Sequence, residues 1–142
     1  MKVITLAHVE SVSFKLAKEM LEYNEPIPDF STRFPNVLES CLLTPFQSFN
    51  KKQLYKALTG KAAILFYLMI KNHPFQNGNK RIAVTTLLAF LYINKKWLEV
   101  NNQELYNFTM WITQSPPKLK KETIEAVEKF IHTYIVDIRG MR

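Results

Sequence analysis

Cysteine, glycine and long apolar runs are all scarce in this sequence. Cys41 is the only cysteine among 142 residues, so no disulfide can form within the chain, and we expect an intracellular, reducing compartment. No apolar run approaches the roughly 20 residues of a membrane span, and the N-terminus lacks the apolar core of a secretory signal. We therefore expect a cytoplasmic protein that does not contact a membrane.

The chain has only 3 glycines, and aromatic residues make up 13% of it. Few glycines together with many aromatic side chains are typical of a compact helical protein rather than a loop-rich one. A chain of 142 residues can bury roughly two-thirds of its unfolded surface. The composition predicts an all-α fold with a single domain over residues 1–142.

The chain has fewer acidic than basic residues: 12 Asp and Glu and 19 Lys and Arg, for a formal charge of +7. Such a charge favours encounter with an acidic partner. The basic residues are scattered without interleaved aromatic residues, which argues against a nucleic-acid-binding surface. An acidic partner protein fits the charge better.

A polar stretch, residues 73–81, lies between two of the most apolar runs of the sequence, residues 62–70 and 82–93. A helix that is apolar on all sides is a buried helix, so both runs are predicted to be central helices. The polar stretch is then a loop that opens at the core.

The residues of this loop predict an anion site. Pro74 disfavours helical geometry at His73, so the first helix should end there, with the imidazole at a helix C-terminus. Gly78 lets the backbone turn tightly, and Asn79 is a good N-cap for the second helix. A glycine turn that leads into a helix N-terminus points N–H groups outward and binds phosphate.

Two further side chains suit the transfer of a phosphate or nucleotidyl group. Lys80 and Arg81 can neutralise charge on the transferring group, Arg81 with two hydrogen bonds. Because an imidazole accepts a proton near neutral pH, His73 can activate a hydroxyl beside a bound phosphate. The stretch therefore indicates phosphoryl or nucleotidyl transfer.

Residues 73–81 resemble the signature of the Fic/Doc family, His-Pro-Phe-x-Asp/Glu-Gly-Asn-Gly/Lys-Arg, at every position but one, and the resemblance extends over about residues 36–95. It implies a helical bundle with a flap near the active-site loop. The loop would bind ATP or another nucleoside triphosphate together with Mg²⁺, with histidine as the general base. Carried over, the catalytic residues are His73 and Arg81, and the nucleotide-binding residues are Phe75, Gly78, Asn79, Lys80 and Arg81.

The exception is Asn77, which stands where the family has a metal-binding carboxylate. A neutral amide oxygen can coordinate Mg²⁺ but brings no charge, so metal binding should be weaker unless the nucleotide phosphates supply most ligands. Lys80 in place of glycine, and Val84 where a second arginine would stand, resemble the Doc toxin branch rather than the AMP-transferring Fic branch.

The flap of the family corresponds here to Phe46, Gln47, Ser48 and Phe49, which follow a short predicted helix over residues 37–43 and the pair Thr44-Pro45. Two phenylalanines around polar residues could present an extended edge to a target segment. The alternative is that Phe46 and Phe49 plug the core under a loop. Both interpretations stay open at this point.

Five helices are predicted besides the short one over residues 37–43, with a loop over residues 24–35. Thr5 should cap a first helix that runs to about Tyr23. Long helices should run over residues 51–72 and 79–95. Asn101 or Asn102 should cap a helix that ends at Ser115, and a last helix should run over about residues 119–139.

The leading hypothesis is a Doc-like toxin that transfers a phosphate or nucleotidyl group from a nucleoside triphosphate to a hydroxyl of a target protein. The resemblance implies a translation factor as the target. The rival is a nucleotide- or partner-binding module that has lost transfer because of Asn77. Self-inhibiting family members carry Ser or Thr followed four residues later by Glu. Here Val127 stands four residues after Thr123, and Val9 stands four residues after Thr5, where the motif needs Glu. Because no built-in inhibitory motif is found, the resemblance implies an antitoxin-like inhibitor in trans.

Overall fold

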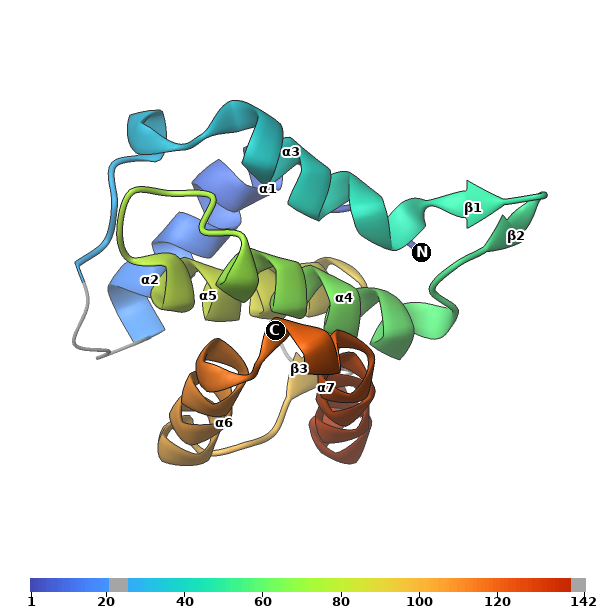
Figure 1. Ribbon diagram of the computed structural model, residues 1–142. Coiled ribbons are helices and arrows are strands. Elements are labelled where there is room, and N and C mark those ends of the chain that lie inside the picture. Colours follow the sequence, from blue (N-terminus) through green and yellow to red (C-terminus); the bar gives the residue numbers. More distant parts are fainter. Residues whose placement is uncertain (21–25, 139–142) are drawn as a thin grey trace.

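Two buried helices form the centre of the molecule. The computed structural model describes residues 1–20 and 26–138. Within it, α4 (Ala57–Lys71) and α5 (Asn79–Ile93) pack side by side, with the remaining helices around them (Figure 1). Residues 61–70 of α4 and 82–91 of α5 are buried throughout. The prediction of two central helices is confirmed.

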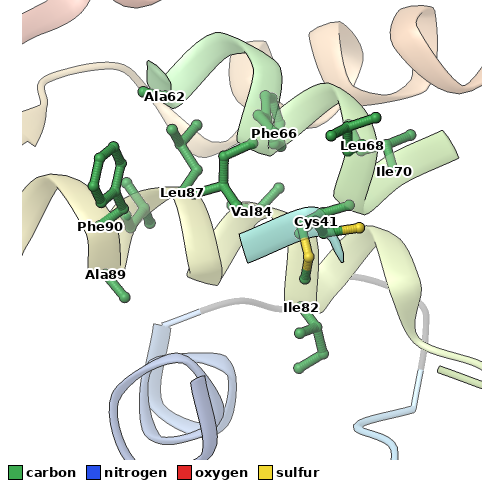
Figure 2. Close-up of a cluster of buried hydrophobic side chains, with 14 of the residues drawn as sticks. Cys41, Ala62, Phe66, Leu68, Ile70, Ile82, Val84, Leu87, Ala89 and Phe90 are labelled. Carbon is green, nitrogen blue, oxygen red and sulfur yellow. The ribbon is translucent and has the colours of Figure 1, made fainter. Parts of the chain in front are cut away.

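The core extends from this pair into the neighbouring helices. Figure 2 shows part of it, with side chains such as Phe66 of α4, Leu87 of α5 and Cys41 of α3 (Pro35–Leu43). These three side chains are fully buried. Burying a side chain of this size contributes roughly 1.5–3 kcal/mol, so the contact between α4 and α5 is a large part of the driving force for folding.

The N-terminal segment covers α5. It consists of α1 (Leu6–His8), a π-helical turn η1 (Val9–Ser13) and α2 (Phe14–Met20). Thr5 caps it as predicted, because its hydroxyl accepts from the His8 N–H while the His8 ring accepts from the Thr5 N–H. The predicted end at Tyr23 lies outside the described residues.

A short connection leads from this layer into α3. It contains the 3-10 turn η2 (Phe30–Thr32), and α3 begins at Pro35, two residues earlier than predicted. Proline suits the first position of a helix because its missing N–H would have no helical partner there. A second 3-10 turn, η3 (Thr44–Phe46), follows α3.

The predicted helix over residues 51–72 is wrong in its first six residues. Residues 48–53 form an antiparallel hairpin, with β1 (Ser48–Phe49) paired to β2 (Lys52–Gln53), and α4 begins only at Ala57. Asn50 and Lys51 both have positive φ, 51° and 64°. A two-residue turn with both residues left-handed is the tight hairpin turn that follows the twist of paired strands.

The C-terminal part adds two helices and a second pair of strands. Asn101 caps α6 (Asn102–Gln114), as predicted, by accepting from the Glu104 N–H. After η4 (Pro117–Leu119), α7 (Lys120–Tyr134) packs on α4. The predicted last helix is too long, because β4 (Ile135–Asp137) leaves it to pair with β3 (Lys96–Leu98), which follows α5.

Apart from these two short strand pairs, the described residues are mostly helical, so the all-α prediction is confirmed. None of the helices in the described part of the chain is long and apolar enough to cross a membrane.

Candidate functional site

The loop between α4 and α5 places His73 at the end of α4. The helix ends at Lys71, Asn72 is its C-cap, and His73 follows with a left-handed φ of 49°. A left-handed residue just past the C-cap is a common way to end a helix, and histidine tolerates it better than most residues. His73 is exposed, while Pro74 after it is buried. The predicted helix stop is confirmed, and the imidazole is accessible.

Gly78 forms the sharp turn at the other end of the loop. Its φ is +69°, and it is the N-cap of α5. A Cβ at this position would clash with the Pro26 carbonyl oxygen and lie 2.7 Å from Cδ of Pro28. Glycine is therefore required both by the backbone conformation and by the close approach of the segment that precedes η2.

Asn79 does not cap α5, contrary to the prediction, because it is the first helical residue and Gly78 occupies the cap position. Its side chain instead bridges the loop. Oδ1 accepts from the Phe75 N–H at 2.9 Å, and Nδ2 donates to the Phe75 carbonyl oxygen at 2.8 Å. Both polar groups of the Phe75 backbone are thus satisfied inside the protein. The amide of Asn79 holds the loop closed.

Phe75 anchors the loop in the core. Its side chain is 1% exposed, and its ring lies 5.5 Å from that of Phe14 and 6.2 Å from that of Phe30, centroid to centroid. The Phe34 N–H donates to the Pro74 carbonyl oxygen at 2.8 Å nearby. Residues 28–34 and α2 therefore fix the position of the loop. The contact of Phe75 with a nucleotide stays a prediction.

The two basic residues of the motif lie in the first turn of α5, where N–H groups have no partner within the helix. Lys80 and Arg81 are half-buried. The Arg81 guanidinium donates to the Ala17 carbonyl oxygen, from Nε at 3.2 Å and from Nη2 at 2.7 Å. The motif arginine thus connects α5 with the last turns of α2.

Few side chains near the motif could coordinate Mg²⁺. Asn77 is exposed, and no Asp or Glu stands between Glu39 and Glu99 in the sequence. Among residues 1–20 and 26–138, no three His, Cys, Asp or Glu side chains gather in a way that could hold a metal ion. The residues therefore suit Mg²⁺ only as an ion that arrives with nucleotide phosphates, with the Asn77 amide oxygen as one ligand.

The four predicted flap residues divide into two kinds. Phe46 is half-buried, with its ring 5.9 Å from that of Phe90 in an edge-to-face arrangement, whereas Phe49 is 69% exposed on the hairpin. The core-plug interpretation thus fits Phe46, and the extended-edge interpretation fits Ser48 and Phe49. Gln47 and Ser48 are also exposed.

The hairpin and the motif loop lie at opposite ends of α4 (Figure 1). The 15 residues of this helix span about 22 Å at 1.5 Å per residue. The structure therefore separates the flap from the loop, where the family resemblance led us to expect them close together. The motif residues lie together, and the flap residues form a second surface.

Two features of the site were not identified from the sequence. The stretch between Glu39 and Glu99 is free of carboxylates but contains basic residues in the hairpin, both central helices and the motif. Within it, Lys61 is buried at the base of the flap. The position of Lys61 directly before the apolar run 62–70 is the signal that could have revealed it.

Cys41 is no candidate nucleophile. Burial raises the pKa of its thiol to about 11, so the unreactive thiol form prevails at neutral pH.

Comparison with known proteins gives one match. A family model described as Fic/DOC family matches residues 3–91, well over half of the chain, and this range includes the whole motif. Members of this family transfer nucleotidyl or phosphate groups to proteins and typically use nucleotide substrates with Mg²⁺. No curated protein and no solved structure matches the chain.

Asn79→Ala should destabilise the protein through the loop. It leaves the buried N–H and carbonyl of Phe75 without their partner, and each unsatisfied group costs roughly 1–3 kcal/mol. We expect the free energy of unfolding in urea to fall by at least about 2 kcal/mol. His73→Ala is the matched control in the same loop, and it should cost about 1 kcal/mol or less, because His73 is exposed and only its left-handed backbone disfavours alanine. Equal stability of the two variants would contradict the bridging role of Asn79.

Proposed function

The chain belongs to the Fic/DOC family, and on this basis we propose that it is a Doc-like transferase that moves the terminal phosphate of ATP, or of a related nucleoside triphosphate, to a hydroxyl of a target protein. The observation that carries the proposal is an exposed histidine just after α4, in the same short loop as the glycine turn that opens α5. The alternative reaction, which transfers a nucleotidyl group to the target protein, would use the same residues.

In the proposed reaction, His73 is the general base. Its imidazole takes the proton from the target hydroxyl as the oxygen attacks the terminal phosphorus, the bond between that phosphorus and its bridging oxygen breaks, and the nucleoside diphosphate leaves. In the nucleotidyl alternative, the same oxygen attacks the α-phosphorus and pyrophosphate leaves. Lys80 and Arg81 stabilise the charge that develops on the transferring group.

The first turn of α5 binds the phosphates in this proposal. Gly78 and Asn79 shape the turn, and the helix N-terminus favours negative charge. Mg²⁺, when bound with the nucleotide, would neutralise phosphate charge. Asn77 is the residue that would contact it, as a neutral ligand.

The toxin assignment rests on Lys80 and Val84, which match the Doc branch of the family. We propose that the target is a component of the translation machinery and that an antitoxin-like protein inhibits the transferase in trans. The net charge of +7 supports an acidic or amphipathic inhibitor segment that folds as it binds. The second candidate function is a nucleotide- or partner-binding module without transfer, which the amide at Asn77 favours.

His73→Ala should abolish most of the transfer without unfolding the protein. Loss of a general base lowers such rates by roughly 10²–10⁴-fold. The wild-type or variant chain is incubated with soluble protein extract and ATP labelled in either the α- or the γ-phosphate. Whichever label appears on protein identifies the transferred group. His132→Ala, which removes an exposed histidine from α7, is the control and should keep full activity. Undiminished transfer by a folded His73→Ala variant would refute the general-base role.

Asn77→Asp should lower the Mg²⁺ concentration that gives half-maximal transfer, because it adds an anionic oxygen where the proposal places the metal. We expect a shift of about tenfold together with a higher maximal rate. Gln76→Glu adds the same charge at the neighbouring exposed position and should leave the Mg²⁺ dependence unchanged. If Asn77→Asp loses activity, the site is built around the amide, and the idea of simple impairment fails.

Expression of the chain in bacteria should arrest growth, and co-expression of the neighbouring gene should restore it. The His73→Ala chain, expressed to the same level, should permit growth because it lacks transfer. Equal growth with the active chain alone and with its neighbour, with intact protein present, would overturn the toxin assignment and favour the binding module.

A further inference from the structure

Lys61 is a buried charged side chain at the edge of the core. It belongs to the second turn of α4 and is 2% exposed, and every residue from Ala62 to Ile70 after it is buried as well. Burial lowers its pKa, because desolvation disfavours the ammonium form. Within the described part of the chain, no carboxylate forms an ion pair with Lys61. Such a group is costly in a core unless its donors are satisfied.

The contacts of the Lys61 ammonium group lead to the hairpin and the residues beside it. Residues 46–56, which include the four predicted flap residues, are called the flap from here on. Nζ donates to Oε1 of Gln53 at 2.6 Å and to the carbonyl oxygen of Tyr55. It also lies 5.8 Å from the centroid of the Phe46 ring, within the range of a cation–π contact. Gln53 belongs to β2, and Tyr55 follows that strand, whereas Phe46 precedes β1.

One cation therefore holds both ends of the hairpin. Phe46 packs its ring against Phe90 of α5, so the incoming end of the hairpin is fixed on the core. At the outgoing end Leu54 is 54% exposed, and the partly buried Tyr55 packs against the core. The Leu54 N–H donates to the Gln47 carbonyl oxygen at 3.1 Å and closes the base of the hairpin directly beside the two Lys61 acceptors.

We propose that Lys61 is the positioning residue of the flap, which fixes the hairpin on α4 and thereby sets where the target segment lies. The inference rests on the proposed function, because it takes the flap to be the target-binding strand. Helix α4 carries Lys61 in its second turn and leads into the loop with His73 at its other end. From Lys61 to the end of α4 is about 15 Å, so a rigid flap places a bound segment at a fixed distance from the histidine.

The kind of target segment follows from the surroundings of the flap. β1 and β2 pair only with each other in the described sheets, so each has one free edge. Lys51, Lys52 and Lys56 are exposed in or beside the hairpin, and no carboxylate lies in this stretch. An extended segment with acidic side chains can pair with a free edge while its charges meet these lysines.

The tether can be tested by cleavage of the flap with trypsin, which cuts after Lys51, Lys52 and Lys56. Lys61→Met keeps the length and apolar stem of the side chain but removes its charge and donors, and urea unfolding establishes that the variant is folded. We expect cleavage in the flap to become at least fivefold faster. Gln53→Ala removes one acceptor without altering the core and should give a smaller increase. Lys129→Met, at an exposed position of α7, is the control and should be cut in the flap at the wild-type rate.

The double variant Lys61→Met/Gln53→Ala distinguishes a tether from general loosening. If both residues act through one contact, the double variant is cut no faster than Lys61→Met alone. Independent destabilisation would multiply the two effects, and that result, or wild-type cleavage of Lys61→Met, would overturn the tether.

The role in target binding is tested by phosphate transfer from labelled ATP to a soluble protein extract. Lys61→Met should need at least fivefold more extract for half-maximal labelling, while its dissociation constant for a non-hydrolysable ATP analogue stays within twofold of wild type. Undiminished labelling despite faster flap cleavage would overturn target positioning. If the wild-type chain labels no protein, the proposed transfer is refuted, whereas the cleavage rates still decide whether Lys61 holds the flap.

Discussion

The contact between α4 and α5 is the constraint on which the rest of the molecule depends. Both helices are buried on all sides over most of their length, so each can exist only when other elements cover it. The N-terminal helices cover α5, and α7 covers α4. The loop between them is short and leads directly from one buried helix into the other, so the core fixes both of its ends. A polar site is thus built at the end of an apolar scaffold.

The loop is also held from outside the two helices. The Asn79 amide satisfies the Phe75 backbone, the Phe75 ring packs against Phe14 and Phe30, and Gly78 accommodates the segment at Pro26 and Pro28. These contacts leave His73 exposed while the residues around it are fixed. In a transferase, such an arrangement reduces the reorganisation needed to bring a base to the reacting hydroxyl.

Local signals in the sequence were sufficient for the parts of the fold that are set locally. The end of α4 before Pro74, the cap at Asn101 and the burial of the two central helices were all predicted, because each depends on residues close in the sequence. The strand pair of β3 and β4 was missed, since it joins residues as distant as Leu98 and Ile135. The hairpin after Phe46 was missed because its turn uses Asn50 and Lys51 in left-handed conformations without a glycine.

The site was predicted in composition but not in the roles of all its members. Asn79 has the chemistry of an N-cap, and only the position of the Phe75 backbone makes it a bridge instead. The position of Lys61 before the apolar run 62–70 hints at burial, but its hydrogen bonds to Gln53 and Tyr55 become visible only in the folded structure. The functional assignments of the motif residues stay predictions. Their relative positions are now defined.

The stretch without carboxylates between Glu39 and Glu99 affects how fast a partner arrives. Its exposed lysines at the hairpin, Lys51, Lys52 and Lys56, add their fields in the surrounding solvent over about 8 Å at physiological ionic strength before salt screens them. An acidic molecule is drawn toward this surface before any contact forms, which raises the association rate constant more than the lifetime of the complex. Added salt should therefore slow the encounter while leaving dissociation almost unchanged. A surface of this kind favours rapid capture of a scarce partner.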